Sequence, residues 1–141
     1  MVISHLRSPL LAPAASLFPK SVQKGILKAA EFAQLSQCPN FRVGAVIFRN
    51  GKMVDGGWNW HKKTHPQSTA RNKGIHAEFH CLSRCSRIEL QGVVLFVARI
   101  TKDGRLAIAR PCFSCQLLLQ DRGFKRIYYT DRNGGIGELR I

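Results

Sequence analysis

Acidic residues are scarce in this sequence: 8 aspartates and glutamates stand against 22 lysines and arginines, which gives a formal charge of +14. Such an imbalance indicates an anionic partner, for example a nucleotide, a polynucleotide or an acidic surface. The alternative is that the charge sets solubility and has no relation to a small substrate.

Long apolar runs and a secretion signal are also absent. Runs such as Val93 to Ala98 are too short to cross a bilayer, so we expect no membrane partner. Pro9 and Pro13 interrupt the apolar stretch near the N-terminus, which a signal peptide would need intact. The 5 cysteines are an odd number, and without a signal they favour reduced thiols and a cytoplasmic location over a disulfide framework.

Length and composition predict one globular domain. A chain of 141 residues with 45% hydrophobic content is long enough to bury a core and too apolar to stay disordered. Residues 1–19 hold no acid and three prolines, so we predict an irregular N-terminal extension there. Residues 20–141 are then expected to form the single domain.

The hydrophobic patterning predicts alternating helices and strands. Asn50-Gly51 indicates a hairpin, and Leu117, Leu118 and Leu119 are expected to face inward from a helix. Strand–helix–strand crossovers in the second half join neighbouring parallel strands, so the order predicts an α/β fold with a mixed sheet and helices on its faces. Helices are expected over 20–37, 76–85 and 112–122, and strands over 42–49, 52–58, 93–100 and 126–130, with an edge strand in the Gly-rich tail.

Two short motifs carry metal-binding chemistry: His76-Ala77-Glu78 and Pro111-Cys112-Phe113-Ser114-Cys115. Each lies at the start of a predicted helix, where partial positive charge stabilises thiolates, the form of cysteine that binds metal. His76, Cys112 and Cys115 offer three ligands to a tetrahedral zinc and leave a fourth position open, as in catalytic sites. The pattern H-x-E…P-C-x-x-C is the known signature of the zinc deaminases.

Glu78 follows the histidine by two residues, so its carboxylate is expected to reach a bound water rather than the metal. Zinc with three protein ligands lowers the pKa of such a water to about 7. Glu78 is therefore the predicted catalytic residue, a proton shuttle from the water to the ring nitrogen and then to the departing amine. An alternative is a closed site in which Cys81 and Cys85 join the other two cysteines, but that site gives Glu78 no role.

The stretch from Arg42 to Thr130 resembles the cytidine and deoxycytidylate deaminase superfamily, most closely its small phage and bacterial members. The likeness is carried by the Val-Gly-Ala-Val-Ile-Phe strand, the hairpin, Gly-Trp-Asn, His-Ala-Glu, Thr-His-Pro, Ala-Arg-Pro-Cys and the Tyr-Tyr-Thr strand. The resemblance implies a three-layer α/β/α fold with a sheet of about five strands, a bound zinc ion and a homo-oligomer. It says little about the substrate, because relatives act on cytosine, adenine, guanine and pterin-like compounds.

The resemblance also implies substrate contacts. Asn59 matches the asparagine that contacts the sugar or base in nucleotide-acting relatives. His80 stands where deoxycytidylate deaminases often carry asparagine, and it is similar to the riboflavin-pathway deaminases, which leaves deoxycytidylate specificity open. The predicted substrate-binding residues are Asn59, Trp60, Lys62, Lys63, Ala77, His80 and Arg110.

The loop over residues 59–74 contains no acid, and a loop of this length in a compact domain is usually functional. Its cations, and Arg110, are either a clamp for a 5′-phosphate or an ordinary solvated charge run. Trp60 is expected to stack on a base and Trp58 to pack in the core. The cations of the loop are Lys62, Lys63, Arg71 and Lys73. The resemblance also implies an alternative use of the loop, because some deoxycytidylate deaminases carry a second metal site, which His61 and His65 would form here with a nearby cysteine.

Three functions remain open at this point. The first is zinc-dependent hydrolytic deamination of a free cytosine nucleotide, with deoxycytidylate as the first substrate to try. The second is deamination of single-stranded DNA or RNA, which the charge and tryptophans favour and the short tail after Thr130 opposes. The third is a catalytically silent, zinc-stabilised nucleic-acid-binding module, which the presence of Glu78 opposes.

Overall fold

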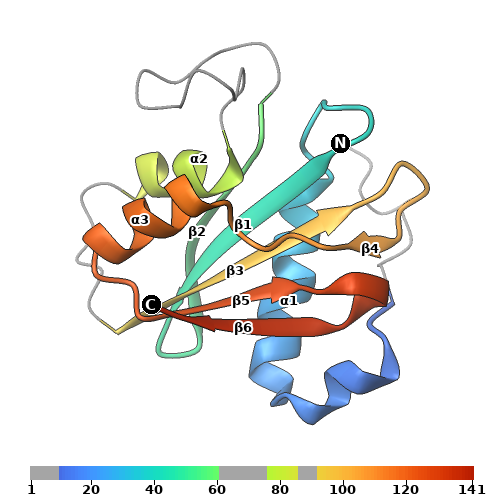
Figure 1. Ribbon diagram of the computed structural model, residues 1–141, viewed down its shortest axis with the longest axis horizontal. Coiled ribbons are helices and arrows are strands. Elements are labelled where there is room, and N and C mark those ends of the chain that lie inside the picture. Colours follow the sequence, from blue (N-terminus) through green and yellow to red (C-terminus); the bar gives the residue numbers. More distant parts are fainter. Residues whose placement is uncertain (1–9, 61–75, 86–91) are drawn as a thin grey trace.

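The computed structural model describes residues 10–60, 76–85 and 92–141. One mixed sheet forms the centre of the molecule, with helices on both of its faces (Figure 1). The helices are α1 (Lys20–Ala33), α2 (Ala77–Arg84) and α3 (Phe113–Asp121), and the strands are β1 (Arg42–Arg49), β2 (Lys52–Trp58), β3 (Val93–Ile100), β4 (Leu106–Ala107), β5 (Arg126–Thr130) and β6 (Ile136–Arg140). Short 3₁₀ helices cover Pro13–Leu17 and Arg132–Gly134.

The strands lie in the order β2-β1-β3-β5-β6, and β4 pairs with β3 alone. β1 is antiparallel to β2 and to β3, so β2 and β3 run in the same direction with β1 between them. β3 is parallel to β5, and β6 returns antiparallel along the outer edge. The prediction that strands joined by a helical crossover are parallel neighbours is therefore correct for β3 and β5. It is not correct for β2 and β3, which are parallel but have β1 between them.

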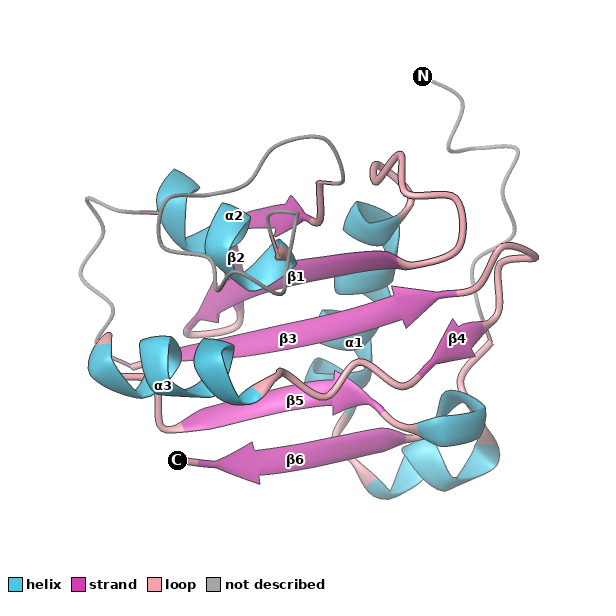
Figure 2. Ribbon diagram, turned by 45° about the horizontal axis from the view of Figure 1, so that its top comes forward, coloured by secondary structure: helices cyan, strands magenta, loops and turns pink. Residues whose placement is uncertain are grey.

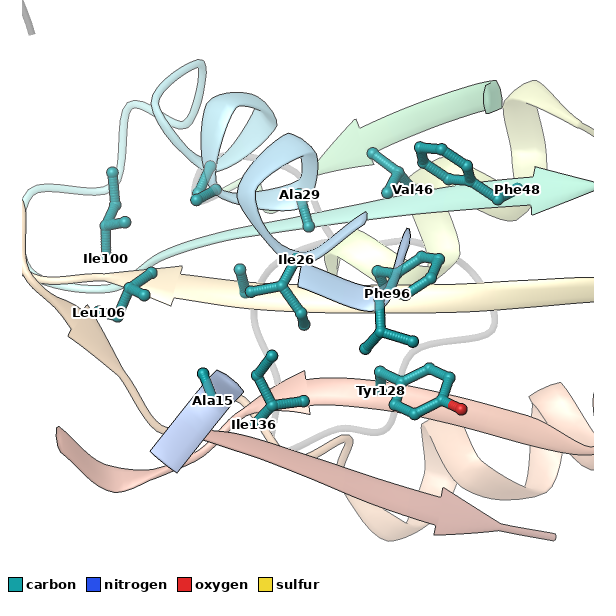
Figure 3. Close-up of a cluster of buried hydrophobic side chains, with 14 residues drawn as sticks. Ala15, Ile26, Ala29, Val46, Phe48, Phe96, Ile100, Leu106, Tyr128 and Ile136 are labelled. Atoms are coloured by element: carbon teal, nitrogen blue, oxygen red, sulfur yellow. The ribbon is translucent and has the colours of Figure 1, made fainter. Parts of the chain in front are cut away.

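The two faces of the sheet carry separate apolar layers, which confirms the three-layer α/β/α prediction. Successive residues of a strand point to opposite faces, so Val46 and Phe48 of β1 pack beneath α1, while Ala45 and Ile47 pack beneath α2. Figure 3 shows the α1 layer, where Ile26 and Ala29 of the helix meet Phe96 and Tyr128 of the sheet. Figure 2 shows α2 and α3 side by side over the other face.

Residues 10–19 contain the 3₁₀ helix where an irregular extension was predicted. Ala15 is 1% exposed and joins the α1 layer with Ile136 of β6. The Ala12 N–H donates to the Gly134 carbonyl at 2.8 Å, so the segment is fastened to the turn before β6. This part of the N-terminal stretch thus covers one end of the core.

Several predicted boundaries shift. α1 ends at Ala33 rather than residue 37, because the chain turns there and the Ser36 hydroxyl donates to the Asn59 carbonyl at 3.0 Å. The two later helices begin one residue after the prediction and leave His76 and Cys112 as N-caps. β4 lies outside every stretch predicted as a strand, and Leu117, predicted to face inward, is 50% exposed.

Gly44 permits α1 to lie directly on β1. A Cβ at this position would lie 2.1 Å from the Ala29 carbonyl oxygen and 2.4 Å from the Ala33 nitrogen. Because both atoms are helix backbone, Gly44→Ala is expected to lower the free energy of unfolding by about 3 kcal/mol in urea titrations. Gly135→Ala is the control, since its Cβ would meet nothing closer than 3.7 Å, and a change of less than about 0.5 kcal/mol is expected. Equal midpoints for the two variants would contradict this account.

Candidate metal centre

Three predicted ligands meet where α2 and α3 begin. His76 is the N-cap of α2, Cys112 is the N-cap of α3, and Cys115 lies in the first turn of α3. The His76 Nδ1 lies 3.2 Å from the Cys115 Sγ and 3.6 Å from the Cys112 Sγ. All three ligand atoms lie within 4.8 Å of one another. Residues 36 positions apart in the sequence, His76 and Cys112, are thus brought to one point.

The spacing of these atoms fits a tetrahedral metal. Bond lengths of about 2.0–2.3 Å to nitrogen and sulfur place tetrahedral ligand atoms about 3.5–3.8 Å apart. Within residues 10–60, 76–85 and 92–141, this is the one group of His, Cys, Asp or Glu side chains close enough to hold an ion. Two thiols and an imidazole form a donor set that zinc prefers.

Cys81 and Cys85 do not join the cluster. Both are fully buried in the α2 layer of the core, and the Cys81 thiol donates to the Asp55 carbonyl at 3.8 Å. They therefore act as small core residues on the inward side of α2. The geometry favours the open three-ligand site over the closed site of four cysteines.

The ring and the two thiols of the centre are coupled electrostatically. The thiol of Cys115 and the ring of His76 donate to Cys112 and lower its pKa to about 3. The pKa of Cys115 is raised by its hydrogen bond to Cys112 and by burial, and that of His76 is raised chiefly by its hydrogen bond to Cys112. These hydrogen bonds therefore stabilise the thiolate form of the exposed Cys112, and the thiolate is the form of cysteine that binds metal.

Glu78 lies against the cluster and is only 5% exposed. Burial is the main cause that raises the pKa of its carboxyl group, and the Cys115 thiol lies close enough to oppose that rise in part. A general acid–base group works best when its pKa is shifted from the value of a free carboxyl in this direction. The side chain thus lies beside the three candidate ligands, and its role as a proton shuttle stays a prediction.

The backbone around the cluster is fixed from two sides. A Cβ on Gly57 would lie 2.5 Å from the Cys81 nitrogen, so only glycine lets α2 lie this close to β2. The buried Thr130 hydroxyl accepts from the Arg99 N–H at 3.1 Å and donates to the Ala107 carbonyl at 2.5 Å. These bonds hold β4 beside β3 and fix the segment that leads into α3. No signal in the sequence marked Thr130 as a supporting residue.

Three of the five described substrate-binding candidates, Asn59, Ala77 and Arg110, lie in different parts of the site region. The Asn59 side chain makes hydrogen bonds to the backbone at the start of β1. Its Oδ1 accepts from the Val43 N–H at 2.9 Å, and its Nδ2 donates to the Phe41 carbonyl at 2.7 Å. Ala77 is 1% exposed at the first position of α2. Arg110 is exposed, and its guanidinium donates to the Tyr129 hydroxyl at 3.3 Å. Their contacts with a substrate stay predictions.

His80 and Trp60 are the other two described candidates, and the His80 ring contacts both tryptophans. Its ring lies edge to face against Trp58 and Trp60, with centroid separations of 4.5 Å and 5.1 Å. Trp58 also stacks against Phe32 at 6.3 Å, in agreement with its predicted packing role. Trp60 is 37% exposed. Outside the described residues lie Lys62, Lys63, Arg71, Lys73, His61 and His65.

The comparisons with known proteins agree with this geometry. A sequence profile described as the cytidine and deoxycytidylate deaminase zinc-binding region matches residues 19–131. The deoxycytidylate deaminase of Mycobacterium phage D29 is 26% identical over 125 residues, which cover 74% of this chain and 88% of the phage protein.

No helix among the described residues is long and apolar enough to span a bilayer.

Two solved structures share the fold. The dCMP deaminase of cyanophage S-TIM5, in complex with dCMP and dUMP, is 22% identical with a TM-score of 0.63, over 82% of this chain and 84% of that chain. The cytidine deaminase of Burkholderia pseudomallei is 18% identical with a TM-score of 0.64, over 84% of this chain and 91% of that chain. The mixed sheet with helices on both faces is therefore a known architecture.

Proposed function

The chain belongs to the cytidine and deoxycytidylate deaminase family, a family of hydrolytic deaminases, and on that premise we propose that it deaminates a free cytosine nucleotide with the help of a zinc ion. The observation that carries the proposal is the cluster of His76, Cys112 and Cys115, with the buried carboxyl of Glu78 beside it. A closed structural site would leave that carboxyl without a function. The open site gives it one.

The proposed reaction adds water across the C4 position of cytosine and releases ammonia. His76, Cys112 and Cys115 would hold a zinc ion, which would supply an activated water at neutral pH. The role of Glu78 would be to accept a proton from the attacking water, to donate it to the ring nitrogen, and to pass the second proton to the amine as the C4–N bond breaks. The water oxygen remains on C4, so the products are a uracil nucleotide and ammonia.

A mononucleotide is the substrate class that the comparisons and the charge support best. The phage relative is named deoxycytidylate deaminase, and the cyanophage enzyme has been solved with dCMP and dUMP. Arg110 is an exposed cation two positions before the ligand Cys112, where it is suited to meet a phosphate. We therefore name deoxycytidylate as the first substrate.

Single-stranded DNA or RNA is the second candidate, and the formal charge of +14 is the observation that favours it. Binding to a polymer releases counterions and falls steeply with salt, whereas turnover of a mononucleotide depends on salt much less. A cytoplasmic location, one domain over residues 20–141 and a homo-oligomer stay predictions that accompany either function. Cysteines that are all free fit a reducing compartment.

A substrate panel tests the proposal. Purified zinc-loaded protein is incubated with cytidine, deoxycytidine, their monophosphates, adenine and guanine nucleotides, and a cytosine-containing oligonucleotide, and ammonia release is followed. We expect turnover of deoxycytidylate at least about tenfold faster, in kcat/KM, than of deoxycytidine, because the phosphate adds charge-assisted hydrogen bonds. Faster turnover of the oligonucleotide than of any mononucleotide would favour the second candidate, deamination of single-stranded DNA or RNA. Tight oligonucleotide binding without turnover of any base would favour the silent binding module.

A further inference from the structure

The His80 ring accepts two hydrogen bonds at one nitrogen. Its Nδ1 accepts from the Trp58 backbone N–H at 3.0 Å and from the Trp60 indole N–H at 3.3 Å. The ring also touches both indoles edge to face. One histidine of α2 therefore fastens the two tryptophans at the end of β2.

Acceptance at Nδ1 assigns the chemical state of the ring. A nitrogen that receives two N–H donors carries no proton, so these hydrogen bonds assign the neutral tautomer that is protonated at Nε2. β2 is one of the two edge strands of the described sheet, and the His80 ring accepts the Trp58 N–H that a further strand would otherwise accept. The same atom then holds the indole of Trp60.

The location of His80 connects this pair of bonds to the metal centre. Its backbone N–H donates to the His76 carbonyl at 3.0 Å, so His80 lies one helical turn beyond the histidine ligand and on the same side of α2. Trp60 follows Asn59 directly and is 37% exposed. An indole whose N–H is bonded to a residue one helical turn from a candidate metal ligand, with part of its surface open to solvent, is suited to stack on a base.

We propose that His80 is a positioning residue, whose Nδ1 holds the Trp60 indole as the stacking surface for the pyrimidine ring of the substrate. The inference rests on the proposed function, because it takes the ligand to be a free cytosine nucleotide. His80 acts through Trp60 and touches no reacting atom. Loss of the hydrogen bond between them therefore weakens nucleotide binding without changing the chemical step.

Two substitutions of His80 test its hydrogen-bond acceptor and its aromatic ring separately. His80→Asn keeps an oxygen acceptor at the same number of bonds from the backbone, whereas His80→Phe keeps an aromatic ring and loses the acceptor. We expect His80→Phe to raise KM for deoxycytidylate about tenfold with kcat within about twofold, and His80→Asn to stay within about threefold of the original KM. Trp60→Phe should raise KM alone and add little in the His80→Phe background. Both His80 variants should keep their zinc.

Tryptophan fluorescence supplies a readout that needs no turnover. In a Trp58→Phe background Trp60 is the one remaining tryptophan, since the chain has 2. Adding His80→Phe to that background should shift the Trp60 emission to longer wavelength and increase its quenching by acrylamide. His80→Asn should leave both properties close to those of the background protein.

The outcomes separate the two proposals. An active enzyme whose KM is unchanged by His80→Phe, or raised equally by His80→Asn, overturns the positioning role and leaves the proposed function standing. If His80→Phe does not fold, Trp60→Phe decides the matter, because it removes the same hydrogen bond from the other side. A wild-type protein that neither deaminates nor binds any nucleotide overturns the proposed function and this inference together.

Discussion

Replacing Glu78 with glutamine is expected to reduce kcat at least about a thousandfold while the metal stays bound. Glutamine has the shape of the protonated carboxyl and cannot move a proton between the water and the ring. The carboxyl touches Cys115 but is not one of the three clustered ligands. Metal content, measured by elemental analysis of the purified protein, should therefore remain near one zinc per chain.

Loss of folding is not expected to explain the loss of turnover. Burial raises the pKa of Glu78, so the folded metal-free chain holds that proton more tightly than the unfolded chain does. The group then costs stability as the pH rises above its unfolded pKa of about 4.3. At neutral pH the neutral glutamine should leave the thermal midpoint of the metal-free protein unchanged or slightly higher.

Glu138→Gln is the matched control. Glu138 is an ordinary ion-pair partner, with its carboxylate 3.1 Å from the guanidinium nitrogens of Arg126 and Arg140. The same chemical change there should alter kcat less than about twofold and stability by at most about 1 kcal/mol. Full activity in Glu78→Gln would remove the proton shuttle from the mechanism.

The strands were predictable because their signal is local. In β1, Ala45 and Ile47 face one layer of the core and Val46 and Phe48 the other, which makes the strand apolar throughout and fixes its bounds. Asn50, with φ of 51°, and Gly51, with φ of 79°, form the turn that the hairpin signal requires. β4 has two residues and depends on the distant Thr130, so its own composition carries no signal.

The error at Leu117 has a geometric cause. Consecutive helical residues lie about 100° apart, so three adjacent leucines cannot all face the same side. Leu119 is fully buried, and Leu117, two positions earlier, points to the opposite side and is exposed. The sequence does not tell which of the three faces inward until the neighbouring strand is placed.

The metal ligands were predictable from the sequence, and the surroundings of His80 were not. Cys112 and Cys115 are three residues apart in one helix, so their meeting needs no long-range information. The bond from Trp58 to His80 joins residues 22 positions apart and exists because α2 packs closely on β2. The one residue in the sequence that reflects this packing is Gly57, where α2 and β2 approach most closely and a side chain would not fit.

Replacing Cys115 with serine is expected to remove the metal and the activity together. Cys115 is fully buried and lies 3.2 Å from the His76 Nδ1, so no water can take its place as a ligand without rearrangement of the first turn of α3. Serine is a weak ligand at neutral pH because its hydroxyl stays protonated, whereas zinc requires a thiolate here. Zinc content should fall from one per chain to below about one tenth, and turnover should fall with it.

Stability gives the same test a second readout. A metal that binds only the folded chain stabilises it by about 4 kcal/mol when its free concentration is a thousand times the Kd. Chelation should therefore lower the thermal midpoint of the original protein and leave that of Cys115→Ser almost unchanged. A midpoint that responds equally in both proteins would mean that the metal is held elsewhere.

Cys81→Ser decides between the open and the closed site. Cys81 matches Cys115 in being a fully buried thiol on a helix, and a serine there retains a donor for the Asp55 carbonyl. In the open site, Cys81→Ser keeps its zinc, its turnover and its response to chelation. In a closed site of four cysteines it loses all three, as Cys115→Ser does. Only the open site leaves a coordination position for water, so retention of zinc by Cys81→Ser is what the proposed catalysis requires.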